Sequence, residues 1–178
     1  MSKNIKNNSQ HKGGDEFFTL YETAHKELMK YDKYLKDKKI ICPCDTRKSN
    51  IYKYLKNMGY NVKCDSKEWR NVDYSKYDIV ITNPPFSQFK EFILKLNELN
   101  IDYIMIAPGV PVYKAKVGLN LSESDFYSTV KNFYIGNYVS EFSTPDGTIK
   151  RAWGQWISSI QNDDKTNIEV NIDGGNDA

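Results

Sequence analysis

An apolar run that is closed by Asn-Pro-Pro, DIVITNPPF at residues 78–86, most constrains what this chain can fold into. A short, continuously apolar run is typical of a central parallel strand, because helices cover both faces of such a strand. Each proline lacks a backbone N–H and holds φ near about −65°, so the strand cannot continue through the pair. The sequence therefore predicts a buried strand that ends in a stiff loop, with Asn83 at its end.

The segments around this run alternate between helical and extended patterns. Apolar residues at helical spacing cover residues 19–34, 49–58, 87–99 and 124–132. Short apolar runs predict strands at 39–44, 60–64, 77–82 and 102–107. Residues 133–142 and 151–160 predict a β-hairpin with its turn at Asp146 and Gly147. This order predicts an α/β fold with a mostly parallel sheet, helices on both faces and a C-terminal antiparallel hairpin.

Polar segments flank the patterned part of the chain. We expect residues 1–14 to form a disordered arm and residues 162–178 a disordered acidic tail, which leaves 15–161 as one domain. The tail holds five acidic residues against one lysine, a net charge of −4, so the rest carries about +6 of the overall +2. That balance is compatible with nucleic-acid binding and equally with a lysine-rich surface in water.

Several classes of protein are disfavoured by composition. No apolar run approaches the ~20 residues of a membrane span, and the first residues lack the apolar segment of a secretory signal. Three cysteines predict a reduced, cytoplasmic chain with no membrane contact. The pair Cys42 and Cys44 has no second pair, and the chain has two histidines, so no metal site is expected.

Three polar side chains follow predicted strands directly. Asp45, Asp65 and Asn83 each stand just past the end of an apolar run. Ligands of parallel α/β sheets bind at the carboxyl ends of the strands, so we expect the three groups to converge on one rim.

The Asn-Pro-Pro-Phe loop has the chemistry to hold an amino group on a flat ring. The Asn83 amide offers an acceptor, the Pro84 carbonyl offers a second one, and the Phe86 ring can stack. Adenine and cytosine have such an amine, and either base would have to be flipped out of a duplex to reach the loop. Alternatively, the loop is only a turn from strand to helix.

DIVITNPPF resembles motif IV of amino-methyltransferases that use S-adenosylmethionine (SAM), in the form typical of N6-adenine enzymes. DEFFT at 15–19 and ICPCDTRKSN at 41–50 resemble the opening and strand-one segments of the EcoRI-type adenine-specific methyltransferase family. The resemblance runs from residue 15 to about 160, in a short, phage- or mobile-element-like form. It implies a Rossmann-like, SAM-dependent methyltransferase fold and methylation of a flipped adenine in DNA at N6.

The resemblance also implies roles for individual residues. The catalytic set would be Asn83, Pro84, Pro85 and Phe86. The cofactor set would be Phe17, Phe18, Thr19, Asp45, Asp65 and Asp73. In the cofactor set, the two phenylalanines and the threonine would line the methionine part of SAM, and Asp45 would contact its amino group.

Asp65 would hold the ribose hydroxyls, and Asp73 would accept from the adenine amine of the cofactor. Each assignment has a structural alternative. Thr19 can cap a helix, Asp45 can cap a loop, and Asp65 can begin a solvated turn. Asp78 is a rival to Asp73, although it is expected at the start of its strand and far from the rim.

Residues 108–121 are expected to be the main loop outside the core. This loop contains Tyr113, Lys114 and Lys116, a basic and aromatic patch suited to DNA or simply to solvent. No separate target-recognition domain is visible, so specificity is either encoded in loops or supplied by a specificity partner. Two alternative functions remain: N-methylation of RNA or of protein glutamine, and an inactive methyltransferase-like module that binds nucleic acid.

Overall fold

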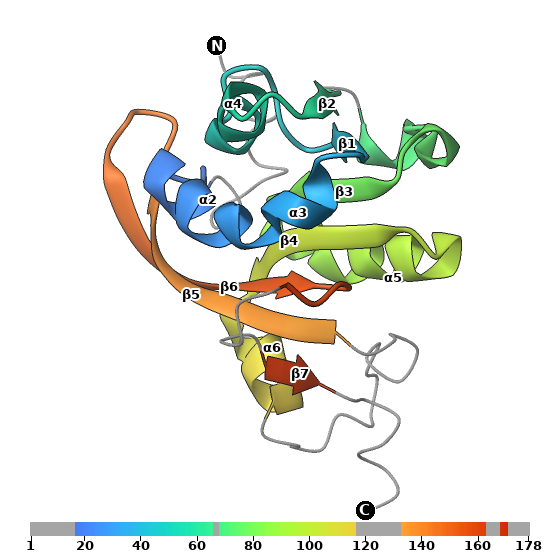
Figure 1. The fold of residues 1–178 in the computed structure, drawn as a ribbon. Coiled ribbons are helices and arrows are strands. Elements are labelled where there is room, and N and C mark those ends of the chain that lie inside the picture. Colours follow the sequence, from blue (N-terminus) through green and yellow to red (C-terminus); the bar gives the residue numbers. More distant parts are fainter. Residues whose placement is uncertain (1–16, 66–67, 117–132, 163–167, 171–178) are drawn as a thin grey trace, which may run out of the picture.

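The computed structural model describes residues 17–65, 68–116, 133–162 and 168–170 (Figure 1). The expected arm at 1–14 and the expected helix at 124–132 lie outside these ranges. The α-helices are α2 (Tyr21–Leu28), α3 (Asp32–Leu35), α4 (Asn50–Asn57), α5 (Phe89–Leu99) and α6 (Gly109–Lys116). Short 3-10 turns are η1 (Met29–Tyr31), η2 (Trp69–Asn71), η3 (Tyr74–Lys76) and η4 (Phe86–Gln88).

Seven strands form one sheet in the order β2-β1-β3-β4-β6-β5-β7. They are β1 (Lys39–Cys42), β2 (Asn61–Cys64), β3 (Ile79–Thr82), β4 (Asp102–Pro108), β5 (Phe133–Ser143), β6 (Ile149–Ser158) and β7 (Ile168–Val170). β2, β1, β3 and β4 run parallel, whereas β6, β5 and β7 each pair antiparallel with the preceding strand in that order. The predicted α/β sheet, mostly parallel in its first strands and with a C-terminal hairpin, is confirmed.

The sheet separates two apolar clusters. Alternate residues of β3 show the division, because Ile79 and Ile81 face a cluster with α2, α3 and α4, whereas Val80 faces a cluster with α5 and α6. Side chains of successive strand residues point to opposite faces, so a strand covered on both sides must be apolar throughout. The complete burial of β3 is therefore the physical cause of the apolar run that ends before the two prolines.

Two expectations for the fold are wrong. Residues 109–116, expected in a loop, form α6, and Val112 is buried against the sheet. The prolines of this segment indicated a loop. Pro111, however, lies in the first turn of the helix, where a missing N–H costs no intrahelical hydrogen bond. In the expected disordered tail, residues 168–170 form β7, because the edge of β5 offers hydrogen-bond partners and Val170 is buried against it.

The hairpin turn lies where it was predicted. Gly147 has φ of 88°, and the Asp146 carboxylate accepts hydrogen bonds from the Thr148 N–H at 3.1 Å and from the Thr144 hydroxyl at 2.5 Å. Figure 1 shows the hairpin rising at its tip towards α2 and α4. The turn follows the last pair of the hairpin, Ser143 with Ile149.

We expect Gly147→Ala to lower the free energy of unfolding by about 1–2 kcal/mol, because an L side chain is disfavoured at this positive φ. No atom lies within 4 Å of the added Cβ, so the cost is that of the backbone alone. Urea denaturation measures it, with Gly59→Ala as the matched control, since Gly59 has φ of 84° and equally open surroundings. A large loss at Gly147 with none at Gly59 would contradict this explanation.

Candidate functional site

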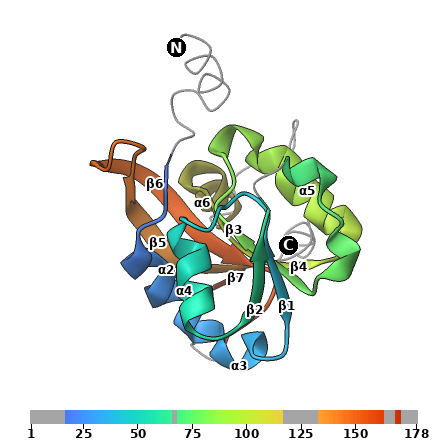
Figure 2. The same cartoon turned by 90° about the horizontal axis from the view of Figure 1, so that it is seen from above.

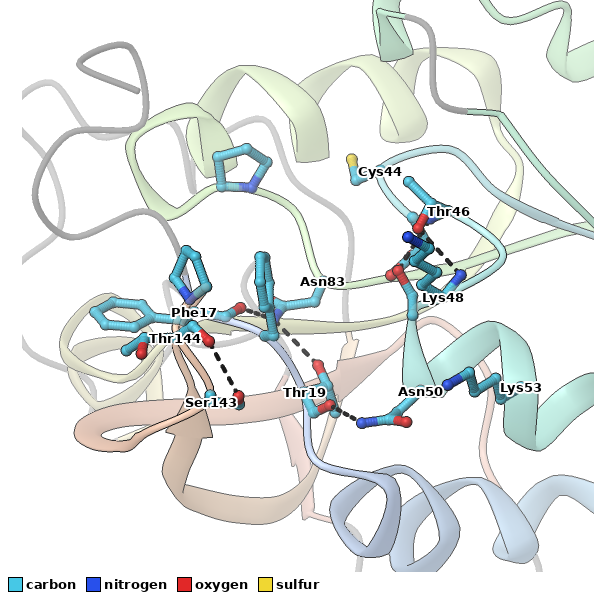
Figure 3. A pocket seen from close by; sticks show the side chains of 16 residues that line it. Phe17, Thr19, Cys44, Thr46, Lys48, Asn50, Lys53, Asn83, Ser143 and Thr144 are labelled. Carbon is cyan, nitrogen blue, oxygen red and sulfur yellow. Dashed lines mark hydrogen bonds between the residues drawn. The ribbon is translucent and has the colours of Figure 1, made fainter. Parts of the chain in front are cut away.

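A cavity of about 700 Å³ lies at the carboxyl ends of β1 and β3 (Figure 3). Four separate parts of the chain line it: the segment before α2, the loop from β1 into α4, the loop after β3, and the hairpin turn. The lining residues are Phe17, Phe18, Thr19, Cys44, Asp45, Thr46, Lys48, Ser49, Asn50, Lys53, Asn83, Pro85, Ser143, Thr144, Pro145 and Gly147.

Asn83 stands between two parts of this lining. Its amide nitrogen donates to the Phe17 carbonyl at 2.8 Å and to the Thr19 hydroxyl at 3.1 Å (Figure 3). Both amide protons are therefore used, and the Asn83 Oδ1 forms no hydrogen bond with the described part of the chain. The side chain thus presents an acceptor at the cavity.

The segment that carries Phe17 and Thr19 is fastened on both sides. Phe18 forms a two-way bridge with Ser143 of the hairpin, with N–H to carbonyl distances of 2.7 and 2.8 Å. The Asn50 amide donates to the Thr19 carbonyl at 3.0 Å from the start of α4. Figure 2 shows this segment running down beside the hairpin tip. The hairpin and α4 therefore hold this segment of the cavity wall from two sides.

Asp45 is a buried carboxylate in the wall of the cavity. The Thr82 hydroxyl donates to it at 2.6 Å and also accepts from the Cys44 N–H at 3.2 Å. Burial raises the pKa of Asp45 from its ordinary 3.8 to about 6, although hydrogen bonds from Thr82 and Ser49 favour the ionised form. A cationic group in the cavity would find a partner whose charge is poorly solvated.

The remaining residues of the Asn-Pro-Pro-Phe loop differ in position. Pro85 lines the cavity, whereas Pro84 is buried and does not. The Phe86 ring packs in a cluster with Phe17, at a centroid distance of 5.4 Å, and with Phe142, at 6.2 Å. The ring expected to stack on a ligand is therefore engaged with other rings, outside the lining.

Two of the expected cofactor carboxylates are not brought to the cavity lining. Asp65 follows β2, and its N–H donates to the Cys42 carbonyl at 3.3 Å, which places it at the same edge of the sheet. Asp73 is exposed and caps η3, accepting from the Ser75 hydroxyl at 2.6 Å. Asp78 lies at the opposite edge, as expected, where it accepts from the Lys39 N–H at 2.8 Å. The ligand roles of Asp65 and Asp73 stay predictions.

The expected DNA-contacting residues lie on α6 rather than in a loop. Tyr113 is exposed there and stands outside the cavity lining. The side chains of Lys114 and Lys116 lie outside the described part of the structure. Their contact with DNA stays a prediction.

Sequence reasoning missed Lys48, Lys53 and the hairpin turn as parts of the lining. Lys48 and Lys53 flank the start of α4, and neither ammonium group has an ion-pair partner among the described residues. The sequence signal for the two lysines was that both lie close in sequence to the loop after β1, where a ligand of a parallel sheet binds. The hairpin turn gave no signal, because it reaches the cavity from a distant part of the sequence.

No group of three potential metal-ligating side chains occurs in the ranges that the structure describes. None of the helices in those ranges is long and apolar enough to cross a membrane.

The mixed sheet, with its cavity at the ends of the parallel strands, is consistent with the fold of a methyltransferase. The family described as adenine-specific methyltransferase EcoRI matches residues 4–64 and 59–158, and the chain belongs to this family.

Two curated relatives are Type II methyltransferases of mycoplasmas. M.MpnI of Mycoplasma pneumoniae is 25% identical in a match that covers 59% of this chain and 42% of the relative. M.MgeORF184P of Mycoplasma genitalium is 27% identical, with 62% and 44% covered. The match therefore spans less than half the length of either relative.

Proposed function

We propose that this chain transfers a methyl group from SAM to the N6 amine of adenine in DNA, on a Rossmann-like methyltransferase core. The observation that carries the proposal is the orientation of Asn83. Its amide donates both protons to the protein, so its Oδ1 remains as an acceptor at the cavity, where an amine can donate. Membership of an adenine-specific methyltransferase family supports the choice of amine.

The cavity suits the proposed cofactor in size and in charge. Its volume of about 700 Å³ lies within the range of small-molecule sites, ~300–1,000 Å³. Asp45 would hold the amino group of the methionine part, because an ammonium offsets the poor solvation of the buried carboxylate. Phe17, Phe18 and Thr19 would line the same end, as members of the wall that Asn83 fastens.

The chemistry places few demands on acids and bases. SAM supplies a methyl group that its sulfonium already activates. The chain's own task is to bind, align and exclude water. Asn83 Oδ1 would accept one amine proton, which draws the nitrogen lone pair out of conjugation with the ring. The carbonyl of Pro84, a residue outside the cavity lining, would accept the second proton once a base enters the loop. Pro85, in the cavity wall, would help to hold the stiff loop against the base.

Lys53 would bind the carboxylate of the cofactor's amino-acid part. It lines the cavity on the α4 side and has no ion-pair partner in the described part of the chain. We expect Lys53→Ala to weaken binding of S-adenosylhomocysteine about three- to tenfold, the usual effect of one partly exposed charge-assisted contact. Calorimetry measures it. Methylthioadenosine, which lacks the carboxylate, is the control ligand, and equal losses for both ligands would count against this role.

The match covers less than half of each relative, so the part of the relatives that it leaves out has no counterpart in the aligned part of this chain. A second protein could therefore supply sequence specificity. The alternatives of RNA, protein glutamine or inactive binding differ in salt dependence. A DNA or RNA substrate predicts affinity that falls steeply with salt, whereas a peptide substrate does not.

We expect the DNA of a bacterial host that lacks adenine methylation to gain N6-methyladenine when it expresses this chain. Mass spectrometry of the digested nucleosides measures the product. The matched control is the Asn83→Ala variant, expressed at the same level, which should give far less product because its rate of transfer is lower. If the host DNA gains none and the purified protein fails to bind S-adenosylhomocysteine, the proposed function is wrong.

A further inference from the structure

We propose that Tyr113, Tyr138 and Trp153 form a stacking platform for an unpaired nucleobase of the bound nucleic acid. The proposal rests on the proposed function for its ligand class, and it assigns a second contact outside the cavity. We call these three side chains the aromatic platform. Two of them, Tyr138 and Trp153, had no role in the sequence-based expectations.

The platform joins exposed rings from three elements. The Trp153 ring on β6 lies 5.9 Å from the Tyr113 ring on α6 and 6.5 Å from the Tyr138 ring on β5, centroid to centroid. The exposed fractions are 49% for Tyr113, 61% for Tyr138 and 39% for Trp153. Single exposed apolar residues are ordinary on a protein surface, but a contiguous aromatic group indicates an interaction site.

The central ring is held in place by the backbone beneath it. A Cβ built on Gly109 would lie 2.2 Å from Cδ1 of Trp153, so the indole packs directly on the chain at Gly109. No other residue type fits there without moving the ring. An aromatic side chain that is fixed in advance loses little conformational freedom when a base stacks on it.

The register of the sheet places the platform at the same edge as the cavity. Pro108, the last residue of β4, pairs with Gly154, so Trp153 lies at the carboxyl end of β4. The same hairpin continues to Ser143 and Gly147, which line the cavity. A nucleic-acid strand with one base in the cavity could therefore run along the hairpin and place a second base on the aromatic platform.

The charge beside the platform favours nucleic acid over protein as the occupant. Arg151 lies two residues before Trp153 on β6, on the same face of the strand, and is exposed. The Lys150 ammonium instead lies over the Phe17 ring, 5.2 Å from its centroid. Arg151 forms an ion pair with Glu141 at a distance of 3.9 Å, and both side chains are well exposed to solvent. Cations next to aromatic rings are the combination with which proteins bind single strands, because phosphates and base faces are then contacted together.

The test separates base contacts from phosphate contacts. We would measure binding of the full chain to a short oligothymidylate and to a strand of the same length made only of abasic sites. We expect the wild type to prefer the strand with bases by about tenfold, and Trp153→Ala to bind both strands equally. Trp153→Phe should restore most of the preference, which a general folding defect would not allow.

Ile149→Ala is the matched control, because Ile149 is 55% exposed on the same strand and outside the platform. It should retain the wild-type preference. A Trp153→Ala variant that still prefers bases would overturn the proposal. Self-association of the wild type that Trp153→Ala abolishes, without a base preference in either, would identify the platform as a protein interface and overturn it as well.

The outcome is separable from that of the proposed function. Host DNA methylation together with an unchanged base preference in Trp153→Ala would refute the platform alone. A base preference that depends on Trp153, in a protein that methylates no DNA, would refute the proposed DNA methylation and support the platform.

Discussion

Asn83→Ala should lower the rate of methyl transfer at saturating cofactor by about 100-fold or more, which corresponds to roughly 3 kcal/mol of transition-state stabilisation. The reason is that Asn83 Oδ1 would accept an amine proton most strongly as the nitrogen attacks. The same change removes two hydrogen bonds, to the Phe17 carbonyl and the Thr19 hydroxyl, so cofactor affinity should also fall. Single-turnover kinetics with purified protein separate the two effects.

Thr19→Ala is the control for this loss. It removes one of the hydrogen bonds from Asn83 but leaves the Oδ1 acceptor in place. We expect it to raise the KM for the cofactor and to leave the rate at saturating cofactor within a few-fold of wild type. If Thr19→Ala reduced that rate as much as Asn83→Ala, the amide would act by fastening the wall, and its proposed contact with the amine would be wrong.

Asp45→Asn should stabilise the ligand-free protein and weaken its cofactor binding. Burial raises the pKa of Asp45 in the folded state to about 6 from 3.8. Between these values the folded state keeps a proton that the unfolded state has lost, so stability falls as pH rises through this window. Above pH 6 the ionised carboxylate costs up to about 3 kcal/mol, and asparagine avoids that cost while its oxygen still accepts from Thr82.

Urea denaturation at several pH values tests the stability half of this prediction. The variant should be more stable than the wild type at pH 7–8, and the difference should disappear near pH 4. Calorimetry with S-adenosylhomocysteine tests the other half, in which wild-type affinity rises with pH through about 6 and the variant shows no such rise. A variant that is less stable at pH 7 would show that Asp45 acts as a structural cap.

A gain in stability together with a loss of cofactor affinity in Asp45→Asn would show that Asp45 serves binding. If a carboxylate serves only the structure, its replacement makes the folded protein less stable. A carboxylate that serves binding commonly lowers the stability of the folded protein, so its replacement raises it. Thr82 supports Asp45 from β3 with a hydrogen bond of 2.6 Å. The last residue of the central strand therefore positions the charge.

Local patterns predicted most of the fold correctly. The apolar runs located β1 to β4 to within a few residues, because a strand buried on both faces admits few polar residues. The Asp146–Gly147 turn was found from its residue types, and Gly147 indeed has positive φ. α6 was missed because Pro111 is a helix breaker in most positions and harmless in the first turn.

The candidate site was predicted from two signals: the end of a strand, and the family resemblance, which alone named Phe17, Phe18 and Thr19 of the lining. Asp45 and Asn83 were found because the end of an apolar run marks the edge of a sheet. Asp73 was assigned by its place in the chain, whereas the structure shows it capping η3, and a sequence pattern cannot distinguish these two uses of an acid.

By itself the sequence determined the order of helices and strands and the stop of β3 before the two prolines that follow Asn83. Only the tertiary structure decided which distant segments meet there: the hairpin turn, the Phe17–Thr19 segment and the start of α4. The periodicity of apolar residues reports which face of an element is buried, but not its partner. Partners follow from sheet order and register, which depend on the packing of the whole chain.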